Sequence, residues 1–191
     1  MRIILITFWL LVPLALAAYH YGPGQSHLKL DYAERALVKA RAAAENQDWE
    51  SAITAYQKAI THLPKEHEEV AVRIRIEVAK AQIQNGGLPQ AREDLIELVN
   101  QLKENKQTTA ELMEDAVSTL ANARYYMTYL MKLEGQPPVE WEPEIEAARQ
   151  EYKLLAQTGV ERDRHLSDLE AAIRLARAEP KDLYGLPIPK P

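Results

Sequence analysis

The chain has 191 residues, with 23 basic and 28 acidic side chains, a net charge of −5 and no cysteine. The lack of cysteine excludes disulfides, thiolate metal ligands, a cysteine nucleophile and a lipid attached to an amino-terminal cysteine. Mild acidity without a basic cluster or arm argues against nucleic acid as a partner. Scarce glycine, at 7 residues, and 47% hydrophobic content predict one folded domain of the all-α class.

The amino terminus has the layout of a secretory signal peptide over residues 1–17. Arg2 precedes an uncharged apolar run, and residues 15–17 (Ala-Leu-Ala) match a cleavage site. The alternative is an uncleaved anchor over residues 3–18, somewhat shorter than the ~20 residues that span a bilayer as a helix. Both readings predict an exported protein of the periplasm or cell envelope, and membrane contact is expected only without cleavage. Residues 18–28 contain a Gly-Pro-Gly sequence, which is typical of turns and loops, and are therefore expected to be a linker.

Residues 46–64 predict one amphipathic helix. Asp48 is placed to cap its start, and Pro64 is expected to end it near Leu63. Between them, apolar side chains recur with the helical period of 3.6 residues and form one stripe. The stripe consists of Trp49, Ala52, Ile53, Tyr56, Ala59, Ile60 and Leu63.

The same stripe recurs twice further along the chain, starting from Leu88 and from Ile145. In all three copies an alanine falls three residues in and a large residue falls seven in. These positions are Ala52, Ala91 and Ala148, followed by Tyr56, Leu95 and Tyr152. Together with the helix of residues 46–64, this self-similarity resembles the tetratricopeptide repeat (TPR) superfamily. The resemblance implies an α-solenoid of two to three antiparallel helix pairs, with the three stripes on the second helices.

The remaining elements of the expected helical domain, residues 29–179, follow from their boundary residues. The first pair spans residues 33–64 and the second residues 72–102, with Pro89 in a first helical turn. Thr108 and Glu111 predict a capping box for a long helix that ends near Lys132, and Pro143 is expected to start its partner. A capping helix over residues 164–178 is expected to bury Leu166, Leu169, Ile173 and Ala176 and to expose Asp168. Residues 180–191 are proline-rich and predict an extended tail.

The resemblance implies that the first helices line a concave groove. On that basis Arg41, Arg73 and Lys80 are the expected groove cations, and the neighbouring positions include Glu34, Leu37 and Ile76. Arg41 and Lys80 correspond one repeat apart and suit an acidic peptide, although Leu37 departs from the family's carboxylate-binding pattern. The alternative is that these cations are ordinary solvated helix residues.

Aromatic side chains crowd the long third helix. Tyr125 and Tyr129 share one face and are candidate peptide contacts, since tyrosine offers apolar area and a hydroxyl group. The alternative is that both belong to the core.

No catalytic motif is evident from the sequence. His67 lacks a second histidine at zinc-protease spacing, and the carboxylates around Trp141 are sequence neighbours rather than a pair set across a cleft. We therefore expect no cofactor, no metal and no enzyme activity. The expected function is a non-catalytic interaction or scaffold module that binds a protein or peptide segment. The alternative is a self-assembling structural protein whose groove takes the tail or linker of a second copy.

Overall fold

The structure is a computed structural model that describes residues 9, 12–13 and 23–183. All regular structure in these residues is helical, which confirms the all-α prediction. Most of the expected signal or anchor segment, and the tail from Tyr184 onward, lie outside the described residues. The helices are α2 (Pro23–Glu45), α3 (Trp49–His62), α4 (Glu68–Gln84), α5 (Leu88–Glu104), α6 (Ala110–Leu133), α7 (Pro138–Thr158) and α8 (Arg162–Arg177), with the short 3-10 helices η1 (Lys65–His67) and η2 (Pro180–Asp182).

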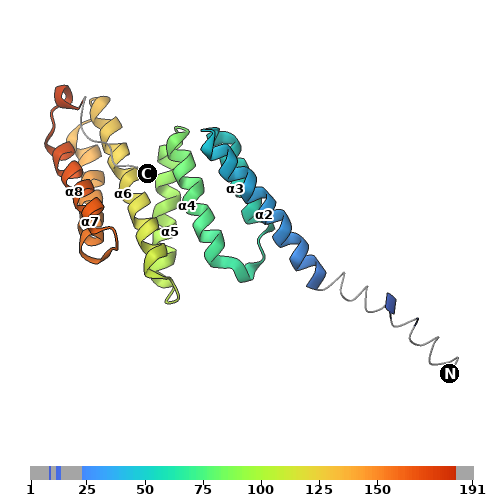
Figure 1. Ribbon diagram of the computed structural model, residues 1–191. Helices are drawn as coiled ribbons and strands as arrows, with labels where there is room; N and C mark the ends of the chain where they lie inside the picture. The colour runs from blue at the N-terminus through green and yellow to red at the C-terminus, as the bar shows by residue number, and fades with distance from the viewer. Residues whose placement is uncertain (1–8, 10–11, 14–22, 184–191) are drawn as a thin grey trace.

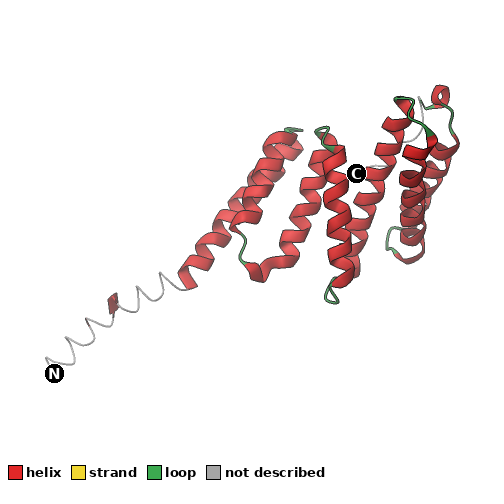
Figure 2. Cartoon of the chain, turned by 180° about the vertical axis from the view of Figure 1, so that it is seen from behind, coloured by secondary structure: helices red, strands yellow, loops and turns green. Residues whose placement is uncertain are grey.

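The helices stand side by side in the order of the sequence (Figure 1). Each one contacts the next, and short turns join them, so consecutive helices run in opposite directions. Helices α4 and α6 also contact each other directly although α5 lies between them in the sequence. The same row is seen from behind in Figure 2, where all connecting loops lie at the two ends of the helices. Alternate helices therefore share one face of the row.

The predicted boundaries of α3 and α5 are confirmed. Asp48 caps α3 by accepting the backbone N–H of Ser51 at 3.2 Å, and Leu63 is extended before Pro64. Gly86 adopts a φ of +81° between α4 and α5, a conformation that side chains disfavour, and Pro89 lies in the first turn of α5.

Two helix starts differ from the sequence prediction. Thr109 rather than Thr108 caps α6, accepting the N–H of Leu112 at 3.4 Å. Thr108 instead donates its hydroxyl to the carbonyl of Leu102, one of the last carbonyls of α5. Helix α7 begins at Pro138, so Pro143 lies inside the helix rather than at its start. Because proline has no backbone N–H, the helix lacks the hydrogen bond from this position to the carbonyl four residues earlier, in its first turn.

Both ends of the expected helical domain extend further than predicted. Helix α2 begins at Pro23, inside the expected linker of residues 18–28, and proline suits a first helical turn. At the other end, η2 occupies the start of the expected tail, and Leu183 is fully buried. The chain is thus fixed to the core up to Leu183.

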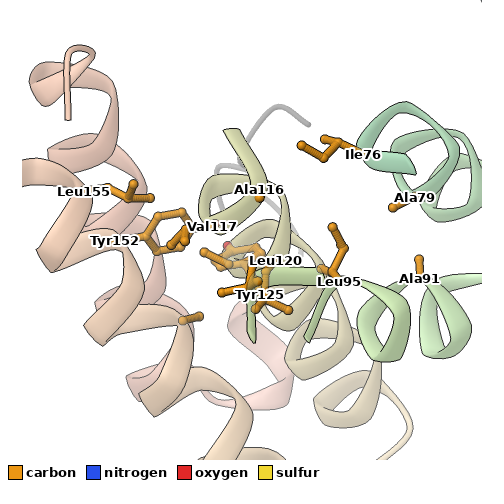
Figure 3. Packing of buried hydrophobic residues seen from close by; sticks show 14 of the residues in the cluster. Ile76, Ala79, Ala91, Leu95, Ala116, Val117, Leu120, Tyr125, Tyr152 and Leu155 are labelled. Atoms are coloured by element: carbon orange, nitrogen blue, oxygen red, sulfur yellow. The ribbon is translucent and has the colours of Figure 1, made fainter. Parts of the chain in front are cut away.

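The larger apolar cluster joins α4 to α8 (Figure 3). Helix α5 contributes its whole predicted stripe, which is buried, and α7 does the same from Ile145 to Ala156. Alanines occupy the closest approaches between helices. The fully buried ones in this cluster are Ala91, Ala116, Ala121, Ala123, Ala148 and Ala172. Tyr125 and Tyr152 are the largest fully buried side chains and fill the space between α6, α7 and α8.

A second, smaller cluster holds α2 and α3 against α4. It consists mainly of alanines around Tyr56, and α4 contributes Ile74 and Val78. The opposite flank of α4 contributes Val72 and Ile76 to the larger cluster. Residues 72–78 alternate apolar and polar in a strand-like manner, yet they form a helix because their apolar side chains serve two clusters on two sides.

The buried face of α8 is rotated from the predicted one. His165, Asp168, Ala172 and Leu175 are buried, whereas Leu166 is 48% exposed. The prediction of the buried face was wrong because it followed the spacing of the leucines alone, whereas a histidine and an aspartate occupy buried positions on this helix.

An ion-pair network joins α5, α6 and α7. Glu144 pairs with both Arg92 and Arg124, and Arg124 Nε lies 3.3 Å from a carboxylate oxygen of Glu151. The other carboxylate oxygen of Glu151 is buried without a hydrogen-bond partner among the described residues. Burial outweighs the attraction of Arg124 and raises the pKa of Glu151 to about 7.

Candidate binding groove

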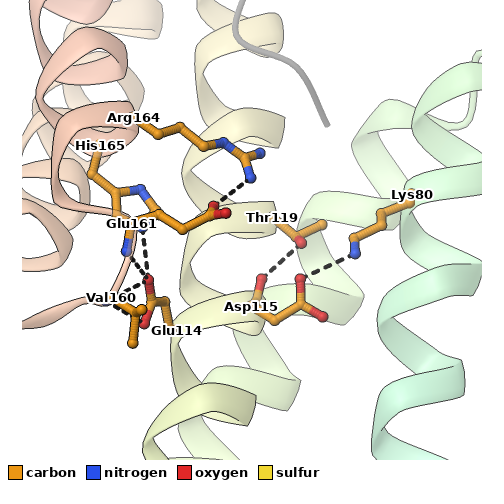
Figure 4. Close-up of polar contacts among 8 residues, drawn as sticks. All are labelled: Lys80, Glu114, Asp115, Thr119, Val160, Glu161, Arg164 and His165. Atoms are coloured by element: carbon orange, nitrogen blue, oxygen red, sulfur yellow. Dashed lines mark hydrogen bonds and ion pairs between the residues drawn. The ribbon is translucent and has the colours of Figure 1, made fainter.

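A polar cavity of about 480 Å³ opens between α4, α6 and the start of α8. Its volume lies within the roughly 300–1,000 Å³ range of ligand pockets. Helix α4 contributes Lys80, α6 contributes the wall, and the turn before α8 contributes the rim (Figure 4). The α6 residues that line it are Glu111, Glu114, Asp115, Ser118, Thr119 and Asn122, and the residues from the turn and α8 are Val160, Glu161, Arg164 and His165. We call this cavity the groove.

Lys80 spans the gap between α4 and α6. Its Nζ lies 3.0 Å from a carboxylate oxygen of Glu77 on its own helix and 3.0 Å from one of Asp115 on α6. Burial lowers the pKa of Lys80, but the attraction of the two carboxylates outweighs it and the net pKa is raised. The ammonium group is therefore charged and fixed at the groove.

Glu114 fixes the turn between α7 and α8 to the side of α6. Its carboxylate accepts the backbone N–H groups of Val160 at 3.0 Å and Glu161 at 3.3 Å, and it lies 3.0 Å from His165 Nε2. Burial raises the pKa of Glu114, but these hydrogen bonds outweigh it and lower the net pKa. The close approach requires glycine at position 159, because a Cβ there would lie 2.7 Å from the Glu114 carboxylate.

Helix α6 presents a row of polar side chains to the groove. Ser118, Thr119 and Asn122 are nearly fully buried yet line the cavity. The Thr119 hydroxyl donates to the carbonyl of Asp115 at 2.8 Å, and the hydroxyl of Tyr152, from behind, donates to the Asn122 side-chain oxygen at 2.6 Å. The back of the row is thus held by the core while its front faces the cavity.

At the rim on α8, Arg164 lies 2.8 Å from the Glu161 carboxylate. Behind it, His165 is 1% exposed, and neither its Nδ1 nor the Oδ2 of Asp168 has a hydrogen-bond partner among the described residues. Burial raises the pKa of Asp168.

The predicted cations have three different positions. Lys80 lines the groove. Arg73 lies beside it, bonded to Glu69 and to the groove residue Glu111 at 3.1 and 3.3 Å. Arg41 is exposed on α2 and is not among the residues that line the groove.

The two predicted tyrosines do not share an environment. Tyr125 is fully buried in the larger cluster, and burial raises its pKa to about 12. Tyr129 is partly buried and lines a different cavity, at the far end of α6. Of the expected groove neighbours on α4, Ile76 is fully buried and belongs to the core.

Sequence reasoning missed Glu114, Asn122, Arg164 and His165. The first and last of these form one contact across 51 residues of sequence, which no local spacing reveals. A signal for Asn122 did exist, since polar side chains interrupt an otherwise apolar stretch over residues 116–123.

The described part of the chain has no group of three or more acidic or histidine side chains placed to hold a metal ion. Within residues 9, 12–13 and 23–183, no helix combines the length and the apolar character that crossing a bilayer requires. Comparisons with protein-family models, with curated proteins and with solved structures found no match for this chain.

Proposed function

We propose that the protein is a non-catalytic binding or scaffold module of the cell envelope that holds an extended peptide segment in the groove. The observation that carries the proposal is the groove itself, because α4, α6 and α8 contribute to one polar surface although other helices separate them in the sequence. A surface built from alternate helices is long and open, which suits a peptide better than a compact small molecule.

The packing supports a TPR-like arrangement of three helix pairs, α2–α3, α4–α5 and α6–α7, with α8 as the capping helix. The second helix of each pair places its equivalent alanine, Ala52, Ala91 or Ala148, in full burial. The contact between α4 and α6 is the kind that adjacent first helices make in such a stack. The envelope assignment rests on the signal-like residues 1–17.

The charge of the groove favours a segment with a basic side chain. The lining holds four carboxylates, Glu111, Glu114, Asp115 and Glu161, against the two cations Lys80 and Arg164. The carboxylates of the lining therefore outnumber its cations by two. Charges at a binding surface set specificity and association rate, and salt screens those that are exposed.

Site-specific photo-crosslinking tests the proposal in the native cell. A photoreactive residue in place of the exposed Glu111 should capture a discrete partner, whereas the same residue in place of the exposed Glu34 on α2 should not. The captured segment is then synthesised and titrated by calorimetry. Asp115→Asn should weaken its binding about tenfold, the cost of losing one charge-assisted hydrogen bond, and Asp31→Asn on α2 is the matched control.

Equal crosslinking at the two positions, or unchanged affinity with Asp115→Asn, would refute the groove as the binding site. The alternative of self-assembly predicts that the captured partner is a second copy of this chain. If light scattering shows a monomer at every protein concentration measured, the alternative of self-assembly is refuted.

The pair of His165 and Glu114 is the arrangement in the groove that most resembles an acid–base site. We assign it to position the turn before α8, because the same carboxylate also accepts two backbone N–H groups of that turn. Glu114→Gln should therefore lower stability.

A further inference from the structure

A second cavity, of about 700 Å³, lies at the far end of α6. We call it the tyrosine cavity. Its α6 wall presents Tyr126, Met127, Tyr129, Leu130 and Met131, and its opposite wall comes from the end of α4 and the start of α5. Helix α6 has 24 residues and is longer than α4, which has 17.

The lining of the tyrosine cavity combines aromatic, apolar and acidic side chains. Leu130 is 44% exposed, and the ring of Tyr129 is only partly buried. The charged residues among the lining are Glu134 and Glu140, and the described lining includes no Lys or Arg. An aromatic-lined apolar groove is the surface that proline-rich segments recognise in the polyproline II conformation, and the two carboxylates add a preference for a nearby cation.

We propose that the chain's own residues 184–191 bind in the tyrosine cavity. This segment, Tyr-Gly-Leu-Pro-Ile-Pro-Lys-Pro, has three prolines, three large apolar or aromatic side chains and one charged side chain, the cation Lys190. Its composition therefore matches the cavity in both apolar character and charge.

The origin of the segment is fixed close to the cavity. Leu183 is fully buried in the same apolar cluster against which Tyr126, Met127 and Tyr129 are packed. The end of α8 lies beside the last turns of α6, because Lys132 Nζ donates to the carbonyls of Leu175 and Ala176 at 2.9 and 3.1 Å.

The length of the segment is sufficient to reach the cavity. From Leu183 it has to cross α6, whose diameter is about 10–12 Å. Eight residues in a polyproline II conformation span about 25 Å. The tether also keeps the segment at an effective concentration on the order of 1 mM, so that even weak intrinsic affinity leads to occupancy.

The methionine side chains of the protein can report this binding. Of the four methionines, Met127 and Met131 line the tyrosine cavity, and Met113 lies near the opposite end of α6. With ¹³C-methyl methionine, the spectrum of the full chain is compared with that of the same chain ending at Leu183. The signals of Met127 and Met131 should shift on deletion, and that of Met113 should not.

A charge variant and a peptide complete the test. Lys190→Glu in the full chain should reproduce part of the deletion shift, whereas Lys181→Glu, an exposed lysine before the segment, should not. A synthetic peptide of residues 184–191 should restore the original signals in the shortened chain. If that peptide binds with a dissociation constant on the order of 0.1 mM, the tethered segment should weaken its apparent binding to the full chain about tenfold.

Three outcomes would overturn the proposal: unchanged methionine signals on deletion, an equal shift at all methionines, or a shift that depends on protein concentration and accompanies dimers in light scattering. The last outcome would mean that the segment binds a second copy. None of these measurements involves Asp115 or the crosslink at position 111, so the groove and the tyrosine cavity are tested independently.

Discussion

Replacing Glu151 with glutamine should remove a pH-dependent cost of folding. In the folded protein the carboxyl group has one oxygen 3.3 Å from Arg124 Nε and the other buried without a partner among the described residues. Its pKa is about 7, against an ordinary value of 4.5. Between these values the folded state binds more protons than the unfolded state, so the free energy of unfolding falls as the pH rises.

The magnitude follows from the difference of the two pKa values. The difference between the ordinary pKa of 4.5 and a pKa of about 7 corresponds to about 3 kcal/mol. The cost is absent below pH 4.5 and complete above pH 7. Because glutamine does not titrate, the stability of Glu151→Gln relative to the unmodified protein should rise by about 3 kcal/mol between pH 4.5 and pH 8.

Urea unfolding followed by circular dichroism at several pH values measures this difference. The exposed Glu104→Gln on α5 is the matched control and should show no such trend. A difference between Glu151→Gln and the unmodified protein that stays constant with pH, or falls as the pH rises, would refute the argument that burial dominates over Arg124.

Three further substitutions test individual contacts. Gly159→Ala should lower the melting temperature and cost about 1–3 kcal/mol, because the added Cβ would lie 2.7 Å from the Glu114 carboxylate; an unchanged melting temperature would contradict the close approach. Lys132→Met should lower the free energy of unfolding measured in urea by about 1–3 kcal/mol, since it leaves the carbonyl of Leu175 without its cross-helix donor. Tyr152→Phe should cost about 1 kcal/mol in the same assay by removing a buried hydroxyl that donates at 2.6 Å, and a neutral effect would show that the bond is not needed.

The helices with a single buried face could be predicted from the sequence. In α5 the apolar positions recur with one helical period from Leu88 to Leu102, and all of them are buried. Helix α4 obscures this signal because Ile74 and Ile76 face different clusters. The boundaries were predicted best where a proline restricts the backbone at a helix end, as at Pro64 and Pro89.

The groove could be predicted only in part, because its residues meet through tertiary contacts. Lys80 could be predicted as a groove residue from its position in the second helix pair, but its partner Asp115 lies 35 residues away. Asp168 was expected to be exposed because polar residues usually are, and its burial depends on how α8 packs against α6 and α7.

The buried alanines also set a limit on what the protein tolerates. Ala116 and Ala148 are fully buried, and a side chain that is only a methyl group lets neighbouring helices pack closely. A larger residue there would act as a wedge that pushes two helices apart. Because α6 forms one wall of the groove, a wedge at Ala116 would alter the width of the groove as well as the stability of the core. The buried alanines would therefore act as spacers that set the distance between the helices around the groove.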